Sequence, residues 1–345
     1  MSAGAATVAR VVRPVREDAR GIVAPEAGLA HFRLDRYPPS PAVARFVDRY
    51  WVASWDLRGR PPYTQQVLAH PVVNVVFTGG TALVHGVKSK IDSRTLREAG
   101  WALGVMFRPA GFRPFLGRTA SAITDRVIPL AELFGPPAAE LSRHLLDMTP
   151  HQDLAGLADR FLAAIVPPGT QPSETTTAIA ERAAAEPSLV RVDALAAGAG
   201  LSARQLQRRF ADHVGISAKA LIRRYRLYEA AEQARLRRDV DWAELAVQLS
   251  YSDQAHLSRD FSALLGMPPR QYALACRGLC ARLPGVMRSP AGRRRPARRG
   301  AARRAPRAAR WPRPGAAGRP PRCWPPWAAT RWPPAPGGPR VTTRR

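Results

Sequence analysis

Residues 195–210 and 245–261 carry the same pattern twice, and this duplication constrains the fold more than any other feature of the chain. Each copy has a short apolar segment, a tight turn, a serine and then a segment rich in Arg, Gln or His. In both copies a glycine, Gly215 or Gly266, stands five residues after the final Phe, and the second copy has one extra residue after Ser252. Two helices joined by a turn of about three or four residues form a helix-turn-helix unit, whose second helix can enter the DNA major groove.

Turn and capping residues set the limits of these helices. Gly200 can take the positive φ that the first turn needs, and Ser202 stands at the N-cap of the following helix. Leu206 and Phe210, four residues apart, then lie on the core face of that helix. The same reasoning places N-caps at the start of three further helices, at Ser217, Asp241 and Ser252.

With the apolar positions turned inward, the polar residues near the start of each second helix face outward. They are Arg204, Gln207 and Arg208 in the first copy and Gln254, His256 and Arg259 in the second. Arg pairs with guanine and Gln with adenine at base edges, and recognition helices use their N-terminal residues for this purpose. A solvated polar face would explain any one of these residues, but the repeated arrangement favours DNA reading. For His256, a surface hydrogen bond is an equal alternative.

Basic residues on the predicted long helix between the two copies have a different role. Lys219, Arg223, Arg224 and Arg226 are predicted to contact phosphates, which position a protein on DNA without specifying sequence. Some of them are expected to pair instead with acids such as Glu229.

The formal charge of +27 does not by itself indicate DNA binding by the repeat. Residues 1–172 hold 20 basic and 14 acidic side chains, and residues 173–275 hold 14 and 12. Residues 276–345 hold 19 arginines and no acid, so most of the net charge belongs to this tail.

The tail also holds 14 of the 34 prolines and shows no apolar periodicity, so it is predicted to be disordered. A basic tail adds non-specific affinity for phosphates. Two alternatives remain open: a solvated tail without a role, or an out-of-frame reading of GC-rich DNA, as three lysines against 50 arginines would suggest.

Short strands are expected between Ala44 and Phe107, where apolar and β-branched runs alternate with turns. They favour a small antiparallel barrel or sandwich, with Pro71 at an edge or bulge. Helical spacing follows, at 130–133, 138–146 and 154–165. The fold class is therefore α+β multidomain, with a barrel-like N-terminal domain that also has helices, an all-α double helix-turn-helix domain and the tail. The expected segments are a flexible arm (1–28), an N-terminal sensing or association domain (29–166), a Pro- and Gly-rich linker (167–173), the DNA-binding domain (174–275) and the tail (276–345).

The segment from about 173 to 275 resembles the DNA-binding domain of the AraC/XylS family of transcriptional regulators. The resemblance rests above all on the run from Tyr251 to Phe261, together with Leu206, Arg208 and Phe210. It implies two helix-turn-helix units, joined by a long helix, that read successive major grooves. Transferred to this chain, the base-reading residues are Arg204, Gln207, Arg208, Gln254, Ala255, His256 and Arg259. The residues expected to contact phosphate are Ser202, Lys219, Arg223, Arg224 and Ser252.

Two residues depart from the family pattern. Ala218 stands where the family usually has proline, which is expected to loosen the start of that helix. Ser250 replaces the usual glycine of the second turn, so strain is expected at this corner.

Residues of about 40–147 resemble, more loosely, the barrel-like domain of uncharacterised actinobacterial regulators. This resemblance implies sensing or self-association. His70, His85 and Arg108 are candidates to line a pocket, although scattered histidines are more often structural.

Other classes of function have less support. Paired carboxylates, a nucleophile elbow and a phosphate loop are not evident, and no cysteine precedes Cys276, which argues against a self-methylating repair regulator. Cys276 and Cys280 form only a weak zinc motif, so no metal, cofactor or enzymatic activity is expected. The expected partner is double-stranded DNA, and further candidates are RNA polymerase, an unknown small-molecule effector and a second copy of the chain. A cytoplasmic location without a membrane span is expected, and a non-specific binder driven by its tail remains the alternative.

Overall fold

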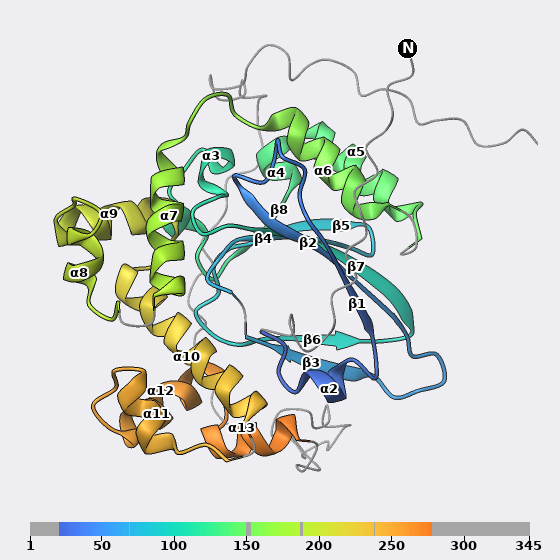
Figure 1. Cartoon of the computed structure of the whole chain (residues 1–345). Coiled ribbons are helices and arrows are strands. Elements are labelled where there is room, and N and C mark those ends of the chain that lie inside the picture. The colour runs from blue at the N-terminus through green and yellow to red at the C-terminus, as the bar shows by residue number, and fades with distance from the viewer. Residues whose placement is uncertain (1–20, 69, 150–152, 187–188, 238, 278–345) are drawn as a thin grey trace, which may run out of the picture. The chain divides into compact units, whose positions relative to one another are not determined.

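The computed structural model describes residues 21–68, 70–149, 153–186, 189–237 and 239–277. All of them belong to the first of two units, Met1–Met287. In this first unit an antiparallel β region with helices is followed by a helical region, which confirms the expected α+β organisation (Figure 1). The predictions for residues 1–20 and for the tail from 278 onward lie outside the described residues.

Antiparallel strands form two sheets in the N-terminal region. The strands are β1 (Arg33–Tyr37), β2 (Val47–Asp56), β3 (Tyr63–Val67), β4 (Asn74–Thr78), β5 (Thr81–His85), β6 (Asp92–Leu96), β7 (Ala99–Phe107) and β8 (Val127–Pro129). The larger sheet has six strands in the order β1-β2-β7-β4-β5-β8, and β3 pairs with β6 separately. The two-stranded sheet lies opposite one face of the six-stranded sheet, which gives the barrel-like arrangement (Figure 1).

One face of the six-stranded sheet carries the apolar core of this region. The paired residues Val75 and Val105 lie on this face with Phe107, and all three are buried. Short helices and two longer ones cover it: α3 (Arg113–Leu116), η1 (Ala120–Ile123), α4 (Ala131–Phe134), α5 (Pro136–Leu146) and α6 (Leu154–Ile165). Phe134 of α4 and Phe161 of α6 meet edge to face at 5.9 Å and close the core from the helical side.

The opposite face of the sheet, turned toward β3 and β6, is only half buried. Trp51 and Gly104 are direct cross-strand partners, and the Trp51 indole occupies the space that a side chain at position 104 would need. Val76 and Met106 lie on the same face and are likewise half buried. His85 connects this face to β6, because its Nδ1 lies 3.4 Å from the Arg94 guanidinium.

The segment ahead of the sheet corrects one prediction. Residues 1–28 were expected to form a flexible arm, but within the described part Ile22 forms a β-bridge with Val67. Val23 and Ala24 are 2% and 3% exposed, and α2 (Pro25–Gly28) follows directly. Apolar side chains buried to this extent hold residues 21–28 against the body of the protein.

The prediction for Pro71 also needs correction. This residue lies between two strands, because β3 ends at Val67 and β4 begins at Asn74. Pro71 therefore precedes β4 instead of lying at its edge or in a bulge. The break is consistent with the chemistry of proline, which cannot donate a hydrogen bond to a neighbouring strand.

The predicted linker coincides with a break between helices, since α6 ends at Ile165 and α7 begins at Pro172. The segment is attached to the sheet region by Arg45, which donates to the carbonyls of Pro167 and Gly169 at 2.5 and 2.7 Å. Arg108 in turn forms two hydrogen bonds with Glu181 of α7, at 2.7 and 2.5 Å. Contacts of this kind join the regions on either side of the linker.

The C-terminal region consists of helices. They are α7 (Pro172–Ala185), α8 (Val192–Ala197), α9 (Ala203–His213), α10 (Ala218–Leu236), α11 (Trp242–Gln248), α12 (Gln254–Leu265) and α13 (Pro269–Cys276). One apolar cluster joins α7, α8 and α9 to the first half of α10, and a second joins α11, α12 and α13 to its second half. Cys276 is buried at the end of α13, so the ordered region extends past the boundary predicted at 275.

The buried His85 is expected to make stability depend on pH. Burial, with a smaller contribution from the neighbouring Arg94, lowers the pKa of His85 to about 4 from an ordinary value of 6.5. Because the pKa is lower in the folded state, the stabilisation is complete above about pH 6.5 and is lost as the pH falls toward about 4. Since one pKa unit corresponds to about 1.4 kcal/mol and solvent screens part of the effect, we expect a loss of about 1–2 kcal/mol.

The measurement is the free energy of unfolding of the wild type and of His85→Gln between pH 7 and pH 4.5. The difference between the two proteins isolates His85, because all other titrating groups are shared. Parallel stability curves over this pH range would contradict the prediction.

Candidate nucleic-acid interface

The first pair of helices is organised by its turn and its cap. Gly200, in the turn after α8, has a φ of 65°, as expected for this corner. The Ser202 hydroxyl accepts from the Gln205 amide at 3.2 Å, and the Gln205 side chain accepts from the Ser202 amide at 2.8 Å. This capping box fixes the start of α9. Leu206 and Phe210 are fully buried, so the rotation of α9 about its axis is fixed as well.

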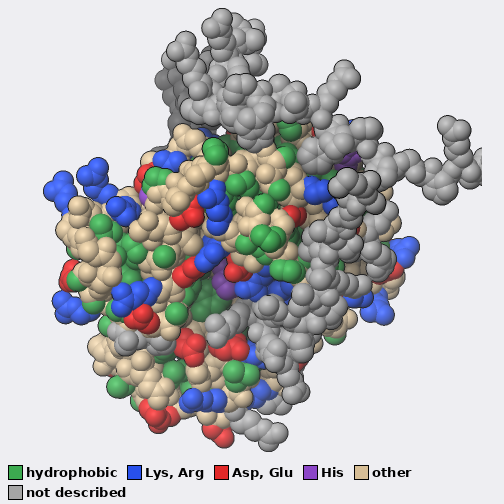
Figure 2. Space-filling model, turned by 45° about the horizontal axis from the view of Figure 1, so that its top comes forward, with side chains coloured by type: hydrophobic (Ala, Val, Ile, Leu, Met, Phe, Trp, Pro, Cys, Tyr) green, Lys and Arg blue, Asp and Glu red, His purple; other side chains and the backbone are tan. Residues whose placement is uncertain are grey.

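The predicted base-reading residues of α9 form an exposed group. Arg204, Gln207 and Arg208 are all exposed, and within the described part of the chain none of their side chains forms a hydrogen bond or ion pair with another protein group. Figure 2 shows Lys and Arg side chains projecting at the left edge of the molecule, where α8 and α9 lie. This face of α9 is therefore available to an external polyanion.

The second pair of helices, α11 and α12, repeats the arrangement with local differences. Asp241 caps α11 by accepting from the amides of Ala243 and Glu244, at 2.9 and 3.0 Å. The cap of α12 is Asp253, which accepts from the His256 amide at 2.7 Å, and not Ser252 as predicted. The extra residue in the second copy explains this shift, because it moves the capping position one residue along the chain.

The predicted base-reading residues of α12 are also exposed, and they are Gln254, Ala255, His256 and Arg259. The His256 ring is exposed but is oriented by two neighbouring residues. Its Nδ1 lies 3.1 Å from the Ser252 hydroxyl, and its ring packs edge to face on Tyr251 at 5.0 Å. The contact with Ser252 is a hydrogen bond at the protein surface, which was the role expected for His256 if it does not read a base.

Asp260 is a residue of this site that the sequence did not reveal. Its carboxylate lies 2.5 Å from the Arg223 guanidinium, and its side chain is 15% exposed. The ion pair joins α12 to α10, and His256 lies 3.9 Å from the same carboxylate. Arg223 and Asp260 lie 37 residues apart in the sequence, so no local periodicity could have indicated this contact.

The residues predicted to contact phosphate lie in different environments. Ser202, Lys219, Arg223 and Ser252 are exposed. Lys219 lies in the first turn of α10, whose N-cap Ser217 accepts from the Ala220 amide at 3.1 Å. A cation at a helix N-terminus opposes the helix dipole, but the same end of a helix favours a bound phosphate.

Two of the predicted phosphate contacts are wrong in this structure. Arg224 is 6% exposed and donates to the carbonyls of Lys88 and Ser89, both at 2.9 Å. Arg226 is 4% exposed and donates to the carbonyls of Glu186 and Leu189. The faces of α10 that carry these two residues are covered by other parts of the protein, which a helical pattern alone does not show.

The candidate pocket residues of the N-terminal region do not come together. His70 stacks on the Tyr228 ring at 4.7 Å, His85 lies beside Arg94, and Arg108 is paired with Glu181. Within the described ranges no group of His, Cys, Asp or Glu has the arrangement of a metal site. In the same part of the chain, every helix is too short or too polar to cross a membrane.

Two family matches agree with this two-part organisation. Residues 35–129 match a domain of unknown function, DUF6597. Residues 195–275, which include both helix pairs, match a helix-turn-helix domain. The C-terminal region therefore contains a helix-turn-helix domain, as its motifs predicted.

A relative among characterised proteins is the F1 operon positive regulatory protein of Yersinia pestis, with 34% identity over 89 residues. The match covers 26% of this chain and 29% of the relative, so this chain spans less than a third of that protein.

Among solved structures, ToxT of Vibrio cholerae O395 is similar with a TM-score of 0.35 and 12% identity, over 72% of this chain and 99% of ToxT. The AraC-like transcriptional activator CuxR is similar with a TM-score of 0.21 and 15% identity, over 58% of this chain and 87% of CuxR.

The strain expected at Ser250 is present, because this residue has a φ of 59° in the turn before α12. The left-handed conformation costs a non-glycine residue about 1 kcal/mol or more. We therefore expect Ser250→Gly to raise the free energy of unfolding by about 1 kcal/mol, as measured by chemical denaturation.

The matched control is Gly200→Ser, which creates the same conflict in the first turn. Gly200 has a φ of 65°, and no atom lies within 4 Å of an added Cβ. A substitution there therefore changes stability through backbone strain and not through a steric clash. This variant should lose a similar amount of stability. If neither substitution changed the free energy of unfolding, the positive φ at these two turns would not cost stability, and the prediction would be wrong.

Proposed function

We propose that this protein is a sequence-specific DNA-binding transcriptional regulator of the AraC type. In this proposal α9 and α12 enter successive major grooves and read bases through Arg204, Gln207, Arg208, Gln254, Ala255, His256 and Arg259. One observation carries the proposal: two capped helices, each anchored by a buried Leu–Phe pair, present exposed Arg and Gln side chains near their N-termini. These side chains form bidentate hydrogen bonds with guanine and adenine.

The geometry of α10 supports reading by both units from a single chain. Ala218–Leu236 is one continuous helix of 19 residues, which corresponds to a length of about 28 Å. Successive major grooves on one side of B-DNA lie about 34 Å apart. A connecting helix of this length is therefore compatible with two recognition helices that occupy adjacent grooves of the same duplex.

Phosphate contacts are proposed for Ser202, Lys219, Arg223 and Ser252. Lys219 fits this role well because it is exposed at a helix N-terminus, where backbone amides also favour an anion. Arg223 is partly committed to Asp260, so we propose that it contributes to phosphate binding while it holds α12 in place.

Alanine substitutions test this division of roles. Arg208→Ala and Arg259→Ala should cost about 1–3 kcal/mol on the preferred site and relax the preference at one base position. Lys219→Ala should weaken binding to all sequences alike and reduce the salt slope by about one unit. The measurement is affinity for a selected site and for random DNA over a range of salt concentrations. Equal losses on both DNAs for the two arginine variants would refute base reading.

Truncation after Arg277 separates the proposal from the alternative of a binder driven by its tail. Arg277 donates to the Arg237 carbonyl at 3.0 Å, so the truncation keeps the last described contact of the helical region. A sequence-specific regulator should keep its preference among DNA sequences without residues 278–345. Loss of nearly all binding would favour the alternative.

We further propose that the N-terminal domain senses an effector or associates with a second copy of the chain. The half-buried sheet face around Trp51, Val76 and Met106 supports this role, because apolar side chains that are not fully covered favour an apolar ligand or a partner surface. We also propose RNA polymerase as a partner, because a regulator that activates transcription contacts the polymerase.

The test uses the full-length protein. We expect its affinity for the preferred site to change on addition of a small-molecule extract, or its sedimentation to reveal a dimer. Coupling between two ligands is reciprocal, so any effector should also bind differently when DNA is present. A monomer whose DNA affinity is the same with and without the extract would contradict this role.

A further inference from the structure

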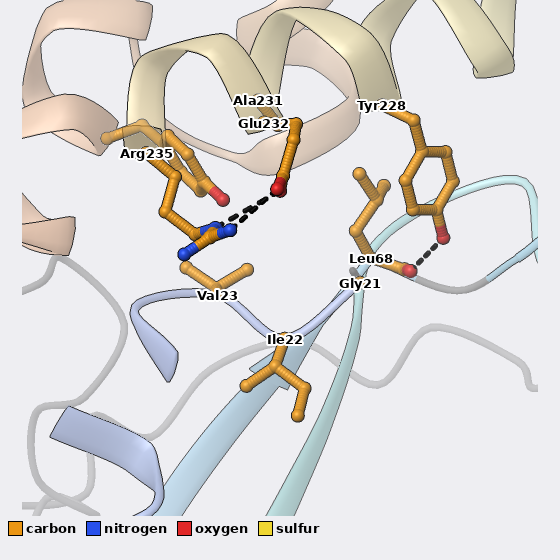
Figure 3. A pocket seen from close by; sticks show the side chains of 9 residues that line it. Gly21, Ile22, Val23, Leu68, Tyr228, Ala231, Glu232 and Arg235 are labelled. Atoms are coloured by element: carbon orange, nitrogen blue, oxygen red, sulfur yellow. Dashed lines mark hydrogen bonds and ion pairs between the residues drawn. The ribbon is translucent and has the colours of Figure 1, made fainter. Parts of the chain in front are cut away.

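One face of α10 packs against the N-terminal region instead of the other helices. Arg224, Tyr228, Ala231 and Arg235 lie three or four residues apart, which places them in one row along the helix. We call these four residues the α10 stripe. Figure 3 shows three of them, Tyr228, Ala231 and Arg235, beside Val23 and Leu68.

The C-terminal part of the α10 stripe is closely packed. The Tyr228 hydroxyl donates to the Leu68 carbonyl (Figure 3). Arg235 lies 3.8 Å from Glu26. Val23 and Leu68 belong to the same apolar cluster as residues of α11, α12 and α13. The remaining cavity is about 10 Å³, room for at most a single water molecule. This contact is therefore a packed joint between domains and not a ligand site.

At the other end of the α10 stripe, Arg224 places its positive charge inside the protein. Its guanidinium donates to the carbonyls of Lys88 and Ser89, in the loop between β5 and β6. Burial lowers the pKa of Arg224, which reflects the cost of taking a cation out of water. Carbonyl dipoles offset part of that cost only while the loop keeps its position. The contact is thus sensitive to small movements of the loop.

The loop itself is firmly attached to a neighbouring turn. The Ser89 amide donates to the Asp125 carboxylate at 2.7 Å, and Gly86 packs so closely on Ile123 that a Cβ would lie 1.7 Å from its carbonyl oxygen. Next to Asp125, the Thr124 hydroxyl donates to the Gly215 carbonyl at 2.6 Å, just before α10 begins. The turn therefore holds Gly215, just before α10, and the loop holds Arg224 within α10.

Both recognition helices depend on α10 for their position. Phe210 of α9 lies in one apolar cluster with Leu221 of α10, and Asp260 of α12 is paired with Arg223 of α10. A displacement of the β5–β6 loop would therefore reach both helices through α10. The same loop follows His85, which lies on the half-buried face of the sheet.

We propose that Arg224 is a coupling residue: it joins the β5–β6 loop of the N-terminal domain to α10, so that DNA binding and the state of that loop depend on each other. This inference rests on the proposed function, because it assigns a route for regulation of the same DNA site. Arg224 acts through the loop and α10 and does not contact DNA in this role.

The test measures amide hydrogen exchange of residues 86–91 in the full-length protein, with and without a duplex that contains its preferred site. In the wild type we expect the duplex to change the exchange rate of this loop at least twofold, although the loop belongs to the N-terminal domain. Arg224→Met keeps an unbranched apolar stem like that of arginine and removes the guanidinium with its hydrogen bonds, so the response of the loop should disappear. Arg224→Lys, which can still donate to a carbonyl, should restore part of it.

Lys88→Ala is the matched control, because it removes a side chain beside the contact and keeps the carbonyl that Arg224 binds. It should respond to DNA as the wild type does. Thr124→Val, which removes only the hydrogen bond to Gly215, provides a second variant if Arg224→Met does not fold, and it should weaken the response. This variant nearly preserves the shape of the side chain at position 124.

Failure of the coupling and failure of the proposed function have different results. A wild type that binds its preferred duplex without any change in the loop would overturn the coupling alone. An unchanged response in Arg224→Met, or in Thr124→Val where Arg224→Met is unfolded, would overturn it as well. A wild type without preference among DNA sequences would instead refute the proposed function.

Discussion

The packing of apolar side chains along α10 determines where α9 and α12, the second helices of the two pairs, lie. Leu221 and Ile222 bury the first helix pair against the N-terminal half of this helix, and Leu227 belongs to the cluster that buries the second. Ala230 and Ala234 have no exposed surface, so the elements around them approach the helix closely. In an interior packed this closely there is little free volume into which a side chain can relax. A displacement of α10 is therefore passed on to the helices packed against it.

Local chemistry explains why the helical region could be predicted well from the sequence. Ser202, Ser217 and Asp241 act as caps as expected, because a capping hydrogen bond involves residues only two or three positions apart. Gly200 and Ser250 both adopt the positive φ that the turns require. These features depend on neighbours in the chain, so the sequence contains the information needed to find them.

For the β region, the antiparallel class could be predicted from the sequence, but the positions of several strands could not. Strands β6 and β8 have five and three residues, and β6 reads Asp-Ser-Arg-Thr-Leu, with little apolar alternation to identify it. β1, also missed, carries the polar residues Arg33, Asp35 and Arg36 in a run of five. Short strands gain their stability from partners distant in the sequence, and pairing with those partners leaves a weak local signal.

The environment of charged residues was the least predictable part of the site. Arg223, Arg224 and Arg226 are near neighbours on one helix, yet the first is exposed beside Asp260 and the other two are buried against backbone carbonyls. Helical periodicity gives the direction of each side chain relative to the axis but not what covers that side. Which arginine remains exposed is therefore decided by how the N-terminal region and α7 pack on α10.

The indole of Trp51 lies over Gly104 and remains half exposed on the open face of the sheet. Indole emission depends on the polarity around the ring, so this position is a natural optical reporter for that face. In a variant whose other tryptophans are replaced by phenylalanine, the emission maximum of Trp51 would register a molecule that binds against this face of the sheet. The pairing of a large aromatic residue with a glycine thus provides a spectroscopic handle on the N-terminal domain without any added label.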